Sequence, residues 1–276
     1  MPDVVSDVMA VFDIDAYLAR TGALDLTRIE WADVPKYPVS PEAIRTLRYM
    51  QDIESHTIVY LRSLLATRAI DDPDVARFLA CGVYEESFHG LALERFLAAA
   101  GHPVGPRPTP HGHESPAQWL EARATALLSR MWPDFCAVHM TWGAINELTT
   151  LTGYRRLAAV AGHPVLSELL ERITLDESRH FFFYYRQAEL RLSRPAVARV
   201  ARLLVDRFWV PVGSGVQPQR ELRFMASYLF SDTRGRAAAR KADDTIRRLP
   251  GFATVGLLER WLDRFADGGL NGNRSD

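Results

Sequence analysis

Apolar residues recur every three or four positions along most of the chain, which is the spacing of one face of an α-helix. Sustained stretches of this pattern predict four long helices, over about residues 40–69, 73–101, 134–161 and 164–192. The alternation of apolar and polar residues that is typical of strands is not visible in the sequence. The sequence therefore predicts an all-α fold.

A proline marks the start of three of these helices, directly after Ser40, Asp72 and His163. Proline is favoured in the first turn because the backbone N–H groups of that turn have no partner within the helix. Serine and aspartate are good caps, since their side-chain oxygens accept hydrogen bonds from those N–H groups. These three helix starts are therefore well defined.

Shorter amphipathic patterns flank the long ones. We expect short helices within residues 4–21, over about 115–130, and in three or four pieces over 195–265 with breaks near 211–218 and 251. Residues 31–38 are expected to be irregular, residues 101–114 a loop and residues 269–276 a disordered tail. Because no linker is evident, residues 1–268 are predicted to form one domain, with its core over about 40–195 and accessory helices over about 195–266.

Composition excludes several classes of protein. A chain of 276 residues, 47% hydrophobic, can bury a sizeable core, and its net charge of −1 argues against nucleic-acid binding. No apolar run approaches the roughly 20 residues that cross a bilayer, and no secretory signal is visible. Cys81 and Cys136 are expected to be buried thiols. We therefore expect a soluble, cytoplasmic protein.

The most informative feature is a repeated Glu-x-x-His motif. Glu86 and His89 form the first copy, and Glu177 and His180 form the second, 91 residues later. The helix-starting proline precedes the glutamate by thirteen residues in both copies. On a helix, residues three apart share a face, so each pair can bind one cation. An internal repeat makes a chance match much less probable.

One further glutamate accompanies each copy. Glu54 lies 32 residues before Glu86, and Glu147 lies 30 residues before Glu177. These separations suit antiparallel helices joined by a short turn, with the glutamates at matching heights. Glu54 falls on an apolar stripe, where a carboxylate is costly unless it is paired or coordinated.

Together these residues form the ligand set of ferritin-like dinuclear carboxylate proteins, in which two helices supply one Glu each and two supply Glu-x-x-His. The sequence therefore predicts a ferritin-like four-helix bundle with additional N- and C-terminal helices. Oxygen and imidazole ligands without thiolate suit two iron ions, with Mn/Fe as the alternative, and O₂ as co-substrate. If the residues were ordinary surface groups, six matched positions on apolar faces would need another explanation.

Neighbouring polar residues have two interpretations each. Asp176 and Glu85 are predicted to accept hydrogen bonds from the histidine of the opposite copy, or else to be solvent-exposed acids. Thr150, one turn after Glu147, either places a hydroxyl near bound O₂ or bonds back to its own helix. Tyr184 is a pocket or redox residue, or plain core, and core is preferred.

Other histidines are weaker candidates. His139, two turns before Glu147, is predicted to be a buried polar residue rather than a seventh ligand. His111 and His113 lie in a segment rich in proline and glycine, where a mobile polar loop is a better explanation than a metal site.

Residues of about 40–195 resemble the soluble acyl-carrier-protein desaturases. Glu85-Glu86-Ser87-Phe88-His89-Gly90 resembles that family's Glu-Glu-x-Arg-His-Gly, and Asp176-Glu177-Ser178-Arg179-His180 resembles its Asp-Glu-x-Arg-His. Glu147-Leu148-Thr149-Thr150 is similar to its third-helix ligand followed by threonine. The resemblance implies that Thr150 lies by the oxygen site, that Asp176 bonds His89, and that the iron ligands are Glu54, Glu86, His89, Glu147, Glu177 and His180.

The resemblance also implies desaturation of an acyl chain on an acyl carrier protein, an electron donor such as ferredoxin, and a homodimer. The chain departs from the family at Phe88, where the family has arginine, and it is shorter than the plant members. A group of arginines either docks an acidic carrier or forms a solvated helix face. These residues are Arg234, Arg236, Arg240, Arg247 and Arg248.

Two alternative functions stay open at this point. The first is a di-iron hydroxylase or N-oxygenase acting on a small or carrier-tethered metabolite. The second is a ferritin-type iron-binding protein, against which the two symmetric motifs and the extra C-terminal helices argue.

Overall fold

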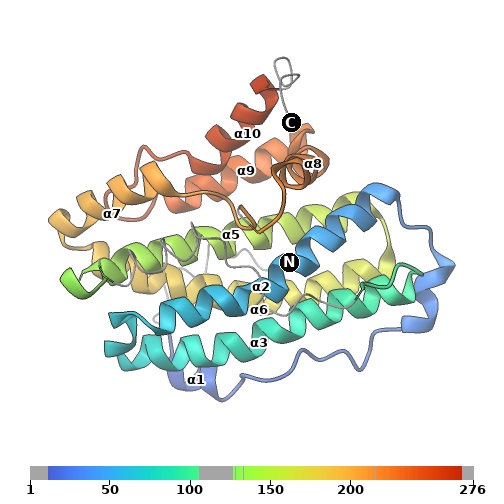
Figure 1. The fold of residues 1–276 in the computed structure, drawn as a ribbon, viewed down its shortest axis with the longest axis horizontal. Coiled ribbons are helices and arrows are strands. Elements are labelled where there is room, and N and C mark those ends of the chain that lie inside the picture. Colours follow the sequence, from blue (N-terminus) through green and yellow to red (C-terminus); the bar gives the residue numbers. More distant parts are fainter. Residues whose placement is uncertain (1–11, 106–126, 128, 133, 215, 269–276) are drawn as a thin grey trace.

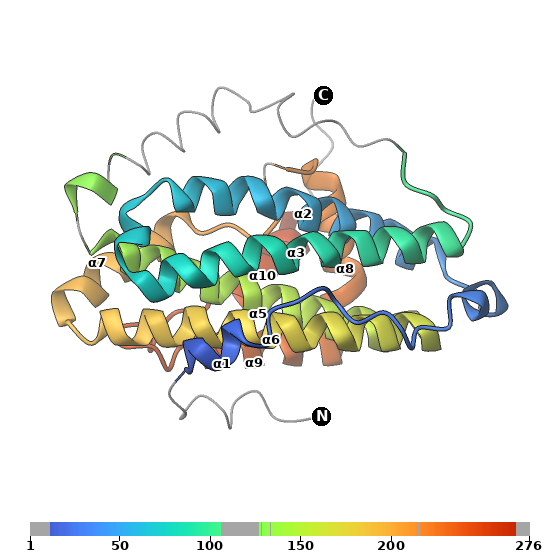
Figure 2. The same cartoon turned by 90° about the horizontal axis from the view of Figure 1, so that it is seen from below.

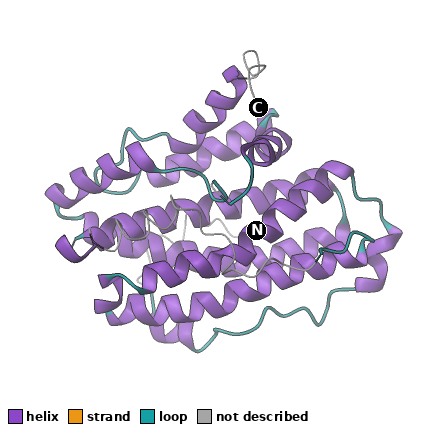
Figure 3. Cartoon of the chain, viewed as in Figure 1, coloured by secondary structure: helices purple, strands orange, loops and turns teal. Residues whose placement is uncertain are grey.

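Four long helices lie side by side and form the body of the molecule (Figure 1). The computed structural model describes residues 12–105, 127, 129–132, 134–214 and 216–268. The described residues are helical and contain no β-strand (Figure 3), which confirms the predicted all-α class. The long helices are α2 (Pro41–Leu65), α3 (Pro73–Ala99), α5 (Phe135–Ala161) and α6 (Pro164–Leu192).

The three predicted helix starts are confirmed, each with a side-chain cap. Ser40 Oγ accepts a hydrogen bond from the Ala43 N–H at 3.1 Å, and Asp72 caps α3 in the same way. His163 caps α6 with Nδ1 and donates from Nε2 to the Val34 carbonyl at 3.1 Å. That second bond ties the start of α6 to the segment that precedes α2.

One predicted boundary and one predicted segment are wrong. The first long helix ends at Leu65 rather than near residue 69, because Thr67 donates to the Leu64 carbonyl and accepts from the Ala69 N–H, which starts the 3₁₀ helix η3 (Arg68–Asp71). The segment expected to be irregular contains a second 3₁₀ helix, η2 (Trp31–Lys36).

Shorter helices surround this body. Four of them lie from Pro195 onward, within the predicted three or four. The break between α8 and α9 was not expected. Asp232 caps α9 at this break by accepting a hydrogen bond from the Gly235 N–H. Most of the helix predicted over 115–130 and the whole predicted tail lie outside the described residues. The short helices are α1 (Ile14–Leu18), α7 (Pro195–Phe208), α8 (Gln219–Phe230), α9 (Thr233–Ile246) and α10 (Leu257–Gly268).

The long helices form two closely packed pairs, α2 with α3 and α5 with α6. Helices α7, α8 and α9 cover α5 on one side of the molecule, and α1 lies near α3 and α6 on the other (Figures 1 and 2). Apolar side chains from α1 through α10 form one continuous core. None of the described helices combines the length and apolar character that crossing a membrane requires.

Candidate metal centre

The six residues predicted as ligands lie together at the middle of the four long helices. Glu54 comes from α2 and Glu147 from α5, while α3 and α6 each supply a Glu-x-x-His pair. Five of the six side chains are buried and Glu147 is half-buried. The helical register therefore brings carboxylates from four separate helices to one level in the core.

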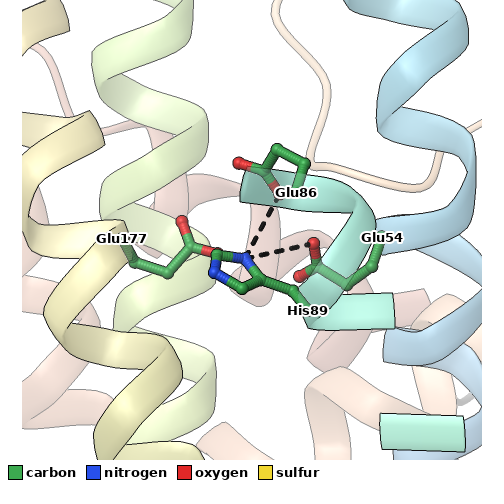
Figure 4. Close-up of side chains that lie close together, drawn as sticks. All are labelled: Glu54, Glu86, His89 and Glu177. Carbon is green, nitrogen blue, oxygen red and sulfur yellow. Dashed lines mark ion pairs between the residues drawn. The ribbon is translucent and has the colours of Figure 1, made fainter. Parts of the chain in front are cut away.

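The donors divide into two overlapping groups. In each group, one ligand atom per residue lies within 4.8 Å of the others. One group is Glu54, Glu86, His89 and Glu177, drawn in Figure 4. The other is Glu86, Glu147, Glu177 and His180. Each group offers four donors to a metal ion, and Glu86 and Glu177 belong to both groups.

Both histidines point one ring nitrogen into the cluster. His89 Nδ1 lies 3.2 Å from Glu177 and 3.4 Å from Glu86 (the latter contact is drawn in Figure 4). His180 Nδ1 lies 3.1 Å from Glu86. Each Nε2 faces outward and donates a hydrogen bond to a carboxylate, since a carboxylate only accepts. This is the orientation that metal-binding histidines adopt.

The outer acids are the two that the sequence suggested. His89 Nε2 donates to Asp176 at 3.2 Å, and His180 Nε2 donates to Glu85 at 2.8 Å. Although burial acts to raise the pKa of Asp176 and Glu85, the hydrogen bonds from the histidines lower the pKa of both groups. The outer acids are therefore ionised acceptors and not solvent-exposed groups.

A single arginine serves both outer acids. Arg179 Nη2 lies 2.6 Å from Asp176 and 3.2 Å from Glu85. The corresponding position in the first copy, Phe88, packs edge to face against Tyr84 with ring centroids 5.0 Å apart. Both outer acids therefore have a cationic partner, although the first copy has no arginine at this position.

Two tyrosines complete the site, and sequence reasoning missed both. The Tyr154 phenol donates to Glu54, and the Tyr17 phenol of α1 donates to Glu85 at 2.6 Å. Tyr154 lies seven residues after Glu147, two turns along the same face of α5, so the helix period contained a usable signal. Tyr17 lies 68 residues before its partner, and no spacing rule links them.

The electrostatics are those of a buried acidic cluster that retains protons. Burial and the neighbouring carboxylates raise the pKa of Glu54 and Glu147 well above the usual range. Burial opposes protonation of His180, yet its hydrogen bonds with Glu85 and Glu86 raise its pKa to about 10. Protons thus supply the positive charge that bound cations can supply instead.

The donor atoms fit such cations. His89 Nδ1 and Glu177 Oε2 are buried and have no hydrogen-bond partner among the described residues. Buried polar atoms are nearly always hydrogen-bonded, so these two atoms are suited to bind a metal ion. Carboxylate and imidazole donors without thiolate suit iron or manganese.

A cavity of about 340 Å³ opens beside the cluster, between α2 and α5. All four glutamates of the cluster line it, whereas His89 and His180 do not. The loop after α7 contributes Val210 to Val212 to its wall. Molecules in this cavity therefore meet the carboxylate side of the cluster.

A smaller cavity of about 60 Å³ lies on the other side of that loop, toward α8 and α10. Its wall is mostly apolar and includes Met225, Phe230 and Trp261. Thr150 and Glu54 both line the two cavities. This position is compatible with a hydroxyl beside the cluster.

Three hydrogen bonds hold the loop between the cavities. Tyr49 donates to the Val212 carbonyl at 2.8 Å, Gln217 donates to Asp52 at 2.7 Å, and Trp209 donates to Asn146 at 3.2 Å. The loop is therefore attached to both α2 and α5.

The remaining sequence candidates fall outside the cluster. Tyr184 is fully packed against Phe78 in the core, as preferred. His139 belongs to neither donor group but lines the larger cavity. Cys81 and Cys136 are half-buried and unbridged, whereas His111 and His113 lie outside the described residues.

Three of the candidate docking arginines pair with acids of this chain, Arg236 with Asp263, Arg240 with Glu259, and Arg247 with Asp244.

Comparison with known proteins adds no relative: no protein-family model, curated protein or solved structure matches this chain.

Proposed function

We propose that this chain is a non-haem, O₂-dependent oxidoreductase of the ferritin-like superfamily with two iron ions as its cofactor. The observation that carries the proposal is the pair of four-donor groups sharing Glu86 and Glu177 beside an accessible cavity. A storage site needs no such cavity, and a purely structural cluster does not explain why His89 Nδ1 and Glu177 Oε2 are left without hydrogen bonds.

In this proposal the iron pair supplies the electrons and the Lewis acidity for O₂ reduction. The side chains of the chain hold and orient the centre. Asp176 and Glu85 fix the histidine rings, and Tyr154 fixes the Glu54 carboxylate. The cavity wall brings the substrate to the carboxylate side, where Thr150 shares the lining with Glu54.

The lining of the larger cavity supports a hydroxylase or N-oxygenase acting on a compact molecule. His56, His139 and Asn146 lie in its wall, whereas a saturated acyl chain is best matched by apolar groups alone. Acyl-chain desaturation is the second candidate, and the apolar smaller cavity beyond Thr150 favours it. The internal pairing of three docking arginines weakens the case for an acidic carrier.

Metal content is the first test. Protein purified from iron-fed cells should contain about two iron ions per chain by elemental analysis. Glu86→Ala and Glu177→Ala should each lose both ions, because each glutamate belongs to both donor groups. Glu171→Ala, an exposed position on α6, is the matched control and should keep both. Wild-type protein without metal, or variants that keep it, would contradict the proposal.

Product mass is the second test. Reduced, iron-loaded protein is supplied with O₂, candidate substrates and a ferredoxin-type donor, as the family resemblance implies. A gain of one oxygen atom supports oxygenation, and a loss of two hydrogens supports desaturation. Gel filtration of the same sample tests the expected homodimer. A large multi-subunit shell would favour iron storage instead.

A further inference from the structure

Two of the described residues that line the larger cavity contain a buried atom without a hydrogen-bond partner, Glu177 in the cluster and His139 outside it. His139 Nε2 is buried and makes no hydrogen bond with any described residue. The ring is held edge to face against Phe135, with centroids 4.7 Å apart and planes at 86°. A buried polar atom without a partner costs stability, so a site that retains one is suited to a ligand that completes the bond.

The imidazole is neutral at physiological pH, because burial lowers the pKa of His139 to about 4. A neutral ring offers one donor and one acceptor nitrogen, and carries no charge that attracts an anion. The nearby Asn146 side-chain oxygen is already engaged by Trp209. His139 is thus a polar group of α5 in this wall, outside the acidic cluster, that is open to a ligand.

The rest of the lining disfavours an anion. Four glutamates face the cavity, and no arginine or lysine among the described residues lines it. Two divalent cations balance the four carboxylates, which leaves no net positive charge to hold a carboxylate or phosphate. Aromatic side chains, those of Tyr60, Phe135 and Trp142, supply flat apolar surfaces instead.

The length of the substrate follows from the helix. His139 and Glu147 both line the cavity and lie eight residues apart on α5, a rise of about 12 Å. A molecule of about two fused rings can therefore bond His139 at one end and approach the carboxylates at the other.

We propose that His139 anchors an uncharged aromatic substrate that carries one hydrogen-bonding group, such as an amide, hydroxyl or amine. This inference rests on the proposed function only in saying which end of the substrate reacts. The anchoring contact itself depends only on the cavity.

Binding of three matched probes tests the anchor. Naphthalene-2-carboxamide, naphthalene-2-carboxylate and 2-methylnaphthalene have similar shapes but differ in charge and hydrogen bonding. Titration calorimetry on metal-free and manganese-loaded protein should show the amide binding at least ten-fold more tightly than the others. His139→Phe should abolish that preference without weakening 2-methylnaphthalene, and His139→Gln should retain part of it. His102→Phe, at an exposed position, is the control.

The outcomes separate the two proposals. Equal binding of the probes, absent binding of the amide, or an unchanged preference in His139→Phe would overturn the anchor. Metal content is measured on the same samples. Wild-type protein that prefers the amide but binds no metal would support the anchor and contradict the proposed oxidoreductase. Wild-type protein that binds metal but does not prefer the amide would contradict the anchor and leave the proposed oxidoreductase supported.

Discussion

His180 Nε2 lies 2.8 Å from the Oε2 atom of Glu85, a residue on the other Glu-x-x-His helix. The reciprocal bond joins His89 to Asp176. Each copy of the repeat therefore orients the histidine of the opposite copy, and the centre depends on α3 and α6 being packed together.

Removing one of these outer acids should loosen metal binding. Glu85→Ala and Asp176→Ala each free a histidine ring, and outer partners of this kind typically contribute about 10- to 100-fold to metal affinity. Titration with Mn²⁺ on metal-free protein measures the effect. Asp74→Ala, an exposed change on α3, should leave the affinity unaltered. Unchanged affinity in the Glu85 and Asp176 variants would show that the bonds do not position the rings.

The two donor groups predict different stoichiometries. Glu54 belongs to one group and Glu147 to the other, whereas Glu86 and Glu177 belong to both. Glu54→Ala and Glu147→Ala should therefore each retain about one ion per chain, at the group that remains complete. Elemental analysis beside the Glu86 and Glu177 variants gives the comparison. Loss of both ions in every variant would mean that the two positions fill only together.

Stabilisation by metal should grow as the pH rises from 6 to 8. The metal-free fold loses stability in this range. The pKa of His180 is about 10 in the fold and near 6.5 in the unfolded chain, so the stabilisation from its protonated ring is complete only below pH 6.5 and falls as the pH rises. The raised pKa values of Glu54 and Glu147 act in the same direction. Metal displaces these protons, so its affinity rises with pH.

Thermal melting with and without Mn²⁺ at several pH values measures this difference. Glu86→Ala should show no pH-dependent gain on adding metal. A gain that falls between pH 6 and 8 would contradict the proton-displacement explanation.

The loop between the two cavities should depend on Gly213. Its φ of +90° lies in the left-handed region, where a residue with a Cβ is strained by about 1–2 kcal/mol. A Cβ there would also collide with Tyr49 and Ile53. Gly213→Ala should therefore destabilise the fold more than Gly101→Ala, which has a φ of +80° but open space around it. Urea unfolding of both variants compares strain alone with strain plus collision.

The repeat made the donor set predictable, because two helices with the same start and the same Glu-x-x-His depth must place their pairs alike. The apolar faces on which Glu54 and Glu147 lie carried the remaining information. The break near residues 211–218 was predicted, but the contact of Tyr17 with Glu85 and the place of this loop between the two cavities were not, since they depend on how distant segments pack. The end of α2 was misjudged because Thr67 bonds to the backbone and ends the helix locally.

The larger cavity is lined by the four glutamates of the cluster but not by His89 or His180, so one side of the centre is closed by protein. A substrate carbon with two mirror-related faces would present only one of them to the reacting side. The proposed oxygenation would therefore give a product of a single handedness, which chiral chromatography of the oxidised product would reveal.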